Sequence, residues 1–190
     1  MDKDEFLLKR IRELANLSYQ RDIVTFTDFL NLNEQNMLAT LKLRQMGVSV
    51  KLFGGYDHAE RQMAAFYPGT VGFSWEYPID CLKITPKALR FSEELGHRDY
   101  LGAILNLGVD RSVVGDILIK DKEAWVFCLH KMSDFFIDNL VRVRHTTVLV
   151  TRVEQAEEIP EPQFEAISGT CASVRLDSLI GLAFQTSRSS

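Results

Sequence analysis

The stretch GDILIKDKEAWVFCL, residues 115–129, has the pattern of two β-strands joined by a short polar turn. Strands are predicted at Asp116–Ile119 and Ala124–Leu129, because both runs are mainly apolar and are bounded by charged turn residues. Successive side chains of a strand project to opposite faces, so Trp125 and Phe127 share one face of the second strand. The rest of the fold can be predicted outward from this hairpin.

The segments on either side extend the hairpin to a ferredoxin-like unit. Ile79–Ile84 is predicted as a strand and residues 97–107 as a helix, and after the hairpin Ser133–Val141 is predicted as a helix and Thr146–Val153 as a strand. The resulting order is βαββαβ, which forms a four-stranded antiparallel sheet with both helices on one face. The other face of the sheet is then left without helices.

The uncovered face has two possible roles. RNA-recognition motifs use it to stack bases on aromatic side chains, and Trp125 and Phe127 would supply such rings. The ribonucleoprotein consensus, a basic residue with a glycine and three aromatic residues, is absent from this strand. Packing of Trp125 and Phe127 in a core is therefore favoured, and base stacking stays open beside it.

The residues before this unit predict a smaller domain of mixed helix and strand. Apolar residues recur at helical spacing over 3–19 and 33–46, and apolar and polar residues alternate as in a strand over Val48–Phe53. A loop is expected around Asp28. A helix from about His58 to Phe66 is predicted from a capping-box pattern and from the proline that follows. The fold class is therefore α+β throughout.

The end of the chain differs in composition from the rest. Residues 154–171 are rich in glutamate and contain two prolines, which predicts an exposed acidic linker. In residues 172–190, apolar side chains fall at the spacing of one helix face: Leu176, Leu179, Ile180, Ala183 and Phe184. Such a stripe needs a partner surface, so these residues are expected to belong to a further domain.

Charge is uneven along the chain. The 190 residues carry 22 basic and 26 acidic side chains, and this net charge of −4 does not suggest a nucleic-acid-binding protein. Residues 82–153, however, hold 11 basic and 9 acidic side chains, whereas residues 154–190 hold 2 and 6. The mildly basic middle is a weak indication of an RNA partner, because an ordinary mixed-charge surface gives the same count.

Membrane and disulfide classes are not favoured. No apolar run exceeds six residues, and charged residues near the start interrupt any signal-peptide pattern. The chain is therefore predicted to be soluble and cytoplasmic, with no membrane partner. Its three cysteines, Cys81, Cys128 and Cys171, are too widely spaced for a zinc site or a disulfide framework and are expected to be buried thiols.

No group of residues indicates catalysis. The sequence has no phosphate-binding glycine–lysine loop, no serine elbow and no histidine pair at helical spacing for a metal. His97–Arg98–Asp99 has the letters of a kinase catalytic loop, but the other kinase motifs do not accompany it. Gly54–Gly55 is interpreted as a tight turn rather than a phosphate cradle, since Asp57 is expected to cap the nearby donors. A protein with no enzymatic activity, cofactor or metal is predicted.

Several short motifs, in this order, resemble those of the YlmH family of bacterial RNA-binding proteins. The resemblance rests on Phe53–Gly54–Gly55–Tyr56, Ala59–Glu60–Arg61, His97–Arg98–Asp99–Tyr100–Leu101–Gly102, Gly115–Asp116–Ile117, Arg175–Leu176–Asp177 and Ser187–Arg188–Ser189. It implies an N-terminal α+β domain at 1–78, an RNA-recognition-like domain at 79–153, the linker at 154–171 and the start of an S4-type module at 172–190. Only the beginning of that module is present.

The resemblance also implies a function. Family members bind structured RNA, so ribosomal RNA or tRNA on the large ribosomal subunit is the expected partner, in ribosome-associated quality control. Their gene commonly lies in a cell-division cluster. The alternative is therefore a protein-interaction scaffold linked to cell division, with RNA contact only through the C-terminal module. The oligomeric state is not predicted.

Candidate RNA-binding residues follow from position and charge. Arg188 lies at the entry of the expected recognition helix of the S4-type module, where a guanidinium can pair with phosphate, and Arg175 opens the same module. In the central domain, basic residues lie before the last strand and after the first strand: Arg142, Arg144, His145, Lys83, Lys87 and Arg90. A basic cluster at one end of the sheet would follow an RNA backbone, and an ordinary soluble surface is the alternative.

Overall fold

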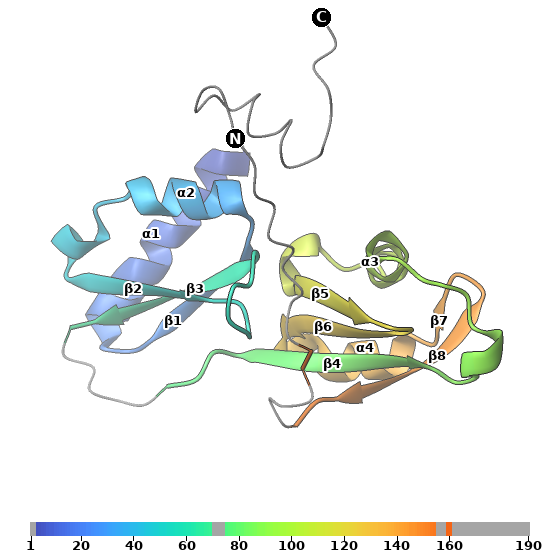
Figure 1. Ribbon diagram of the computed structural model, residues 1–190. Helices are drawn as coiled ribbons and strands as arrows, with labels where there is room; N and C mark the ends of the chain where they lie inside the picture. Colours follow the sequence, from blue (N-terminus) through green and yellow to red (C-terminus); the bar gives the residue numbers. More distant parts are fainter. Residues whose placement is uncertain (1–2, 70–74, 155–158, 161–190) are drawn as a thin grey trace, which may run out of the picture. The chain divides into compact units, whose positions relative to one another are not determined.

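Two antiparallel sheets follow each other along the chain in the computed structural model (Figure 1). The structure describes residues 3–69, 75–154 and 159–160. Arg175, Arg188 and the predicted S4-type module lie outside these residues, as does most of the predicted linker. The described residues all lie in one unit, Met1–Pro160. The predicted domain boundary at residue 78 therefore stays a prediction.

The first sheet has three strands in the order β1-β3-β2, all antiparallel. Helix α1 packs on it through Ile11, Leu14 and Ala15, which share a buried core with Ala64 and Phe66. The elements of this part are α1 (Lys3–Arg21), β1 (Thr25–Leu30), α2 (Leu32–Thr40), a 3₁₀ helix (Leu43–Met46), β2 (Val48–Phe53) and β3 (Gln62–Pro68).

The predicted helix from His58 to Phe66 is wrong, because β3 occupies Gln62–Pro68 as the central strand of the sheet. All four residues of Met63–Phe66 are buried, so the strand shows no alternation of apolar and polar residues. A short run buried on both faces cannot be told from a buried helix by its periodicity.

The loop predicted around Asp28 is also wrong, since β1 runs from Thr25 to Leu30. Its register shifts between Phe26 and Phe29, and this irregularity interrupts the alternation that would have marked a strand. Its two threonines are buried, and each makes a hydrogen bond: Thr25 Oγ1 donates to Leu14 O at 2.9 Å, and Thr27 Oγ1 accepts from Ala64 N at 2.9 Å. The predicted helix over 33–46 is divided into α2 and the 3₁₀ helix.

The second sheet confirms the predicted βαββαβ unit. Its strand order is β5-β6-β4-β8-β7, in which β7 is a two-residue addition at one edge. The elements are β4 (Ile79–Pro86), a 3₁₀ helix (Leu89–Phe91), α3 (His97–Leu105), a 3₁₀ helix (Arg111–Val113), β5 (Val114–Lys120), β6 (Glu123–Leu129), a 3₁₀ helix (His130–Met132), α4 (Ser133–Asn139), β7 (Arg142–Val143) and β8 (Thr146–Arg152).

Both helices of this unit pack on the same face of the sheet, as predicted. Tyr100 of α3 and Phe136 of α4 share one buried core with Val126 and Cys128 of β6. Side chains alternate along β6, so the intervening residues point the other way. The helix-covered face is therefore a closed apolar core.

The opposite face of β6 is buried as well. Trp125 and Phe127 are 5% and 1% exposed, and they pack with Phe29 and Met63 of the first sheet. The Tyr56 ring is stacked on Phe127 with the ring centroids 4.9 Å apart. The core interpretation of Trp125 and Phe127 is confirmed, and the base-stacking alternative for these two rings is wrong.

The carboxylate of Asp116 holds this closure in place. It accepts three hydrogen bonds from the turn before β3: from Tyr56 OH at 2.9 Å, from Glu60 N at 2.7 Å and from Arg61 N at 3.1 Å. The two motifs at 53–61 and 115–117 therefore meet at a single carboxylate. The prediction that Asp57 caps a helix here is wrong. The backbone N–H groups of Glu60 and Arg61 donate to Asp116 instead.

Close approach at this contact requires glycine. Gly55 has a φ of +102°, and a Cβ built on it would lie 2.3 Å from Phe127 Cδ1. A Cβ on Gly115 would lie 2.7 Å from Phe29 Cε1. Any side chain at either position would push apart the two layers that the Asp116 hydrogen bonds hold together.

A double-mutant cycle tests the contribution of Asp116. We expect Tyr56→Phe to lower the free energy of unfolding by about 1 kcal/mol and Asp116→Asn to lower it by about 2 kcal/mol, because a hydrogen bond to a charged group is the stronger kind. The double variant should lose less than the sum of the two, since the variants share one interaction. Urea unfolding measures all four proteins, and strictly additive losses would contradict the direct contact.

Candidate nucleic-acid interface

Basic side chains gather at one end of the second sheet. Lys87, Arg90, Arg142 and His145 are all exposed. The segment that follows β4 lies beside the turn between β7 and β8, because Lys87 N donates to Thr147 O at 3.0 Å. The structure therefore brings together the basic residues that follow the first strand of the unit and those that precede its last strand. Their contact with RNA stays a prediction.

Lys83 does not join this group. Its ammonium lies 2.9 Å from Glu123 Oε2 and 5.1 Å from the centroid of the Trp125 ring. The Lys83 side chain is 29% exposed, and its charge is balanced by its own carboxylate partner. The Trp125 ring beneath it has a buried Nε1 without a hydrogen-bond partner in the described part of the chain. Lys83 thus belongs to the surroundings of Trp125.

Arg144 is held beside the first turn of α3. Its Nε lies 3.5 Å from Asp99 Oδ1. The other oxygen of Asp99 accepts from Gly96 N at 2.9 Å, a bond that caps the start of the helix. Because the Arg144 side chain is 57% exposed, this ion pair contributes little to stability and leaves the guanidinium open to solvent.

A groove of about 540 Å³ runs between α3 and the β7–β8 turn. One wall is formed by α3 and the two residues that follow it, through Arg98, Asp99, Gly102, Ala103, Asn106 and Leu107. The other wall contains Asn139, Arg142 and Arg144. Three arginines and Asp99 are among the lining residues, so the net charge of the groove is positive, while Leu140 and Val141 add apolar surface.

The α3 side of this groove was not among the RNA-binding residues predicted from the sequence. Arg98 and Gly102 lie in the stretch His97–Gly102, which contributes to the family resemblance but carries no separate signal for binding. Helical spacing already placed Arg98 and Gly102 on one face. Nothing in the sequence indicated that Arg142 and Arg144 would face them.

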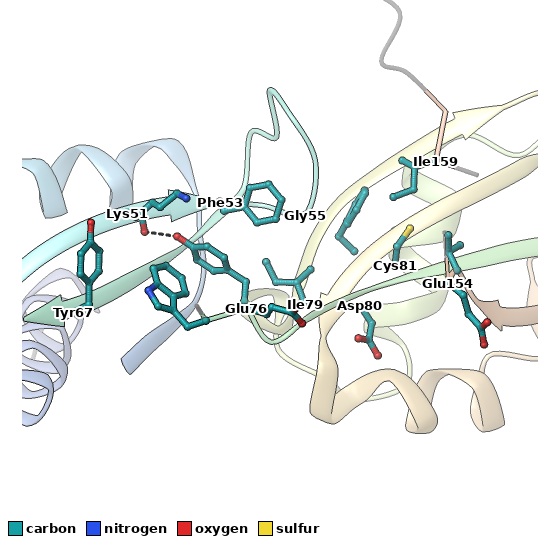
Figure 2. A pocket seen from close by; sticks show the side chains of 14 residues that line it. Lys51, Phe53, Gly55, Tyr67, Glu76, Ile79, Asp80, Cys81, Glu154 and Ile159 are labelled. Carbon is teal, nitrogen blue, oxygen red and sulfur yellow. Dashed lines mark hydrogen bonds between the residues drawn. The ribbon is translucent and has the colours of Figure 1, made fainter. Parts of the chain in front are cut away.

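A second cavity, of about 740 Å³, is lined by aromatic rings (Figure 2). Trp75 is one of these rings, and its centroid lies 5.0 Å from that of Tyr77 and 5.7 Å from that of Tyr67. Tyr77 OH donates to Lys51 O at 2.8 Å, and burial raises the pKa of Tyr77 above its ordinary value. Carboxylates also line this cavity, those of Glu76, Asp80 and Glu154, and they make it unsuitable for a phosphate group.

Asp80 is the centre of a polar network at the edge of that cavity. It accepts from Ser133 Oγ at 2.6 Å and lies 2.9 Å from Arg152 Nε and 3.0 Å from His130 Nδ1. Burial works to raise the pKa of Asp80, but the hydrogen bonds from Ser133 and His130 and the charges of His130 and Arg152 outweigh it. The pKa is held below its ordinary value of 3.8.

Among the described residues, no three His, Cys, Asp or Glu side chains are grouped so that they could hold a metal ion.

Cys81 and Cys128 are buried thiols outside any disulfide, as predicted, whereas Cys171 lies beyond the described part. Burial raises the pKa of the Cys128 thiol to about 12. No described helix has the length and apolar character needed to cross a membrane.

The fold and the basic groove define a class: an α+β protein that combines a small N-terminal sheet with a ferredoxin-like sheet of the RNA-recognition type. Residues 75–157 match the family model described as "Putative RNA-binding domain in YlmH". The central domain is therefore similar to this family, which confirms the resemblance stated from the motifs.

Two individual proteins are similar to the chain. It is 27% identical over 175 residues to "Ribosome-associated protein quality control protein P2" of Bacillus subtilis (strain 168), which covers 85% of this chain and 63% of that protein. The chain thus spans less than two thirds of that relative's length. The solved structure of "Cell division protein ylmH from Streptococcus pneumoniae" is similar with a TM-score of 0.66 and 23% identity, over 84% of this chain and 96% of that one, which confirms the α+β fold.

The Asp80 network predicts a pH dependence of stability. Folding lowers the pKa of Asp80, so the stabilisation is present above the ordinary value of 3.8 and is lost as the pH falls through the folded value. We expect Asp80→Asn to lower the melting temperature at about pH 7, and this difference to shrink as the pH falls below 3.8. Thermal unfolding at several pH values measures this. A difference in melting temperature between the two proteins that does not change with pH would contradict the ion pair.

Proposed function

We propose that this chain is a non-enzymatic protein that binds structured RNA on the large ribosomal subunit, in ribosome-associated quality control. The observation that carries the proposal is the group of exposed basic side chains at one end of the second sheet, formed by Lys87, Arg90, Arg142 and His145. Ion-pair partners for these four are absent from the described part of the chain, so the side chains are available to an anionic partner. The description of the matching family model, and the name of the Bacillus subtilis relative, support RNA and the ribosome as that partner.

The closed sheet face determines how RNA is bound in this proposal. Trp125 and Phe127 cannot stack on bases, because both are buried and Tyr56 is stacked on Phe127. Binding then depends on contacts with phosphates, which carry little sequence information. RNA would be recognised through the shape of its backbone, as double-stranded RNA commonly is.

Several finer statements belong to the same proposal. A tRNA on the large subunit would be a further RNA partner, and ribosome association would place the protein in the cytoplasm. The proposal needs neither cofactor nor catalytic residue. Arg175 and Arg188 would add phosphate contacts from the S4-type module.

A protein-interaction scaffold linked to cell division is the second candidate. The aromatic cavity around Trp75 favours it, because rings mixed with carboxylates suit a peptide better than a phosphate backbone. Salt separates the two functions, since RNA binding weakens steeply as the salt concentration rises, whereas binding through the aromatic rings of this cavity depends on it far less.

Salt-titrated binding to large-subunit ribosomal RNA tests the proposal. We expect the affinity to fall linearly in log–log form, and Lys87→Glu with Arg142→Glu to flatten the slope by roughly 1.5, because each phosphate contact contributes about 0.7 to 0.9. Arg12→Glu, on the exposed side of α1, is the matched control and should keep the slope of the unaltered protein. Binding that does not depend on salt, or equal losses from both changes, would contradict the proposal.

A further inference from the structure

We infer that the groove between α3 and the β7–β8 turn binds the phosphodiester backbone of RNA, with Gly102 in its α3 wall and Arg144 as a contact residue in the opposite wall. The inference rests on the proposed function and assigns it a particular surface. It adds the α3 side, Arg98, Gly102 and Asn106, to the basic residues predicted from the sequence.

Gly102 has no explanation in the packing of the protein. It lies inside α3, where glycine is less favourable than any residue except proline. A Cβ built on it meets nothing within 4 Å, so an alanine would fit without contact. The close approach that requires glycine elsewhere, at Gly55 and Gly115, is therefore absent here. A glycine at this position is explained if a ligand must approach the helix surface closely, because any side chain would occupy that space.

Arg144 also contradicts a local preference. Its φ is +50°, a left-handed conformation that L residues with long side chains rarely adopt. The other non-glycine residues with positive φ in the described part are Asp22, His58 and Asp121, all of types enriched in this conformation. Glycine or asparagine would suit the backbone at 144 better. The exposed Asp99 ion pair gives too little stability to explain an arginine there.

These two unfavourable choices line the same groove. Residues that contradict local preference without a gain inside the fold are expected at functional sites. The two choices are complementary, because glycine leaves the α3 wall without a side chain and arginine supplies a guanidinium from the opposite wall. Arg98 and Arg142 add two more guanidiniums beside them. A guanidinium pairs with a phosphate through two parallel hydrogen bonds, so the groove fits a phosphodiester backbone.

Substitutions that improve the fold while closing the groove give the sharpest test. We expect Gly102→Leu to keep or raise the melting temperature and to weaken binding to a large-subunit RNA hairpin about tenfold, with Gly102→Ala between it and the unaltered protein. Asn36→Leu is the matched control, since Asn36 is exposed on α2, and it should leave RNA affinity unchanged.

Arg144→Gly is the second variant. It relieves the backbone at residue 144, so the melting temperature should not fall, while RNA affinity drops about tenfold with the loss of one charged contact. Arg12→Gln removes an equal charge from exposed α1 and should change RNA affinity far less.

The outcomes separate the groove from the wider proposal. If the unaltered chain binds RNA and the groove variants bind equally well, the groove assignment is overturned and the proposed function stands. If the unaltered chain shows no salt-dependent RNA binding, both are overturned. Poly-L-glutamate serves as a mimic of an acidic protein partner and competes with the RNA hairpin for the chain. If it displaces the hairpin as well as unlabelled RNA of the same total charge does, the assignment to a phosphodiester backbone is overturned.

Discussion

The hydrogen bonds that Asp116 accepts from Tyr56, Glu60 and Arg61 are the constraint on which the rest of the structure depends. They hold the turn before β3 against β5 and so place the Tyr56 ring on Phe127. Burial and the neighbouring Asp116 carboxylate raise the pKa of Tyr56, which keeps its hydroxyl protonated as a donor. Arg61 strengthens the contact by donating to Phe29 O at 3.0 Å and to Val114 O at 3.2 Å.

This contact changes what a ferredoxin-like sheet can do. In the RNA-recognition motif the face without helices is open to bases, whereas here it is part of a buried aromatic core. Within the described residues, the surface proposed for a nucleic acid is the end of the second sheet that carries Lys87, Arg90, Arg142 and His145, together with the groove beside α3. Both present charged and polar groups, so the architecture favours recognition of a backbone over recognition of bases.

The sequence predicted the second sheet well and the first sheet poorly, for a physical reason. Strands β4, β6 and β8 alternate or are bounded by clear turns, and their helices have a clear apolar face, so the βαββαβ order could be found. Strand β3 is buried on both faces and β1 contains an irregularity, so the signals that identify strands are missing. Periodicity identifies half-buried elements and fails where burial is complete.

The candidate site was predicted only in part. Arg142, Arg144 and His145 were found because they form a basic run, and Lys87 and Arg90 because they follow a strand. Lys83 was grouped with them, but the structure shows it paired with Glu123. The groove itself depends on α3 packing against β7, a contact between distant parts of the chain that no local pattern contains. Glycine in a helix and arginine at positive φ are meaningful only once the backbone is known.

One measurement tests most directly whether RNA meets the groove while the sheet face stays closed. The chain has two tryptophans, so the indole signals of Trp125 and Trp75 can be assigned by nitrogen-15 NMR with a single Trp75→Phe variant. During titration with a large-subunit RNA hairpin, the backbone amides of Gly102 and Arg144 should shift and the indole signal of Trp125 should stay in place. A shift of the Trp125 indole with unchanged amides at Gly102 and Arg144 would show that RNA opens the sheet face, and would contradict this account.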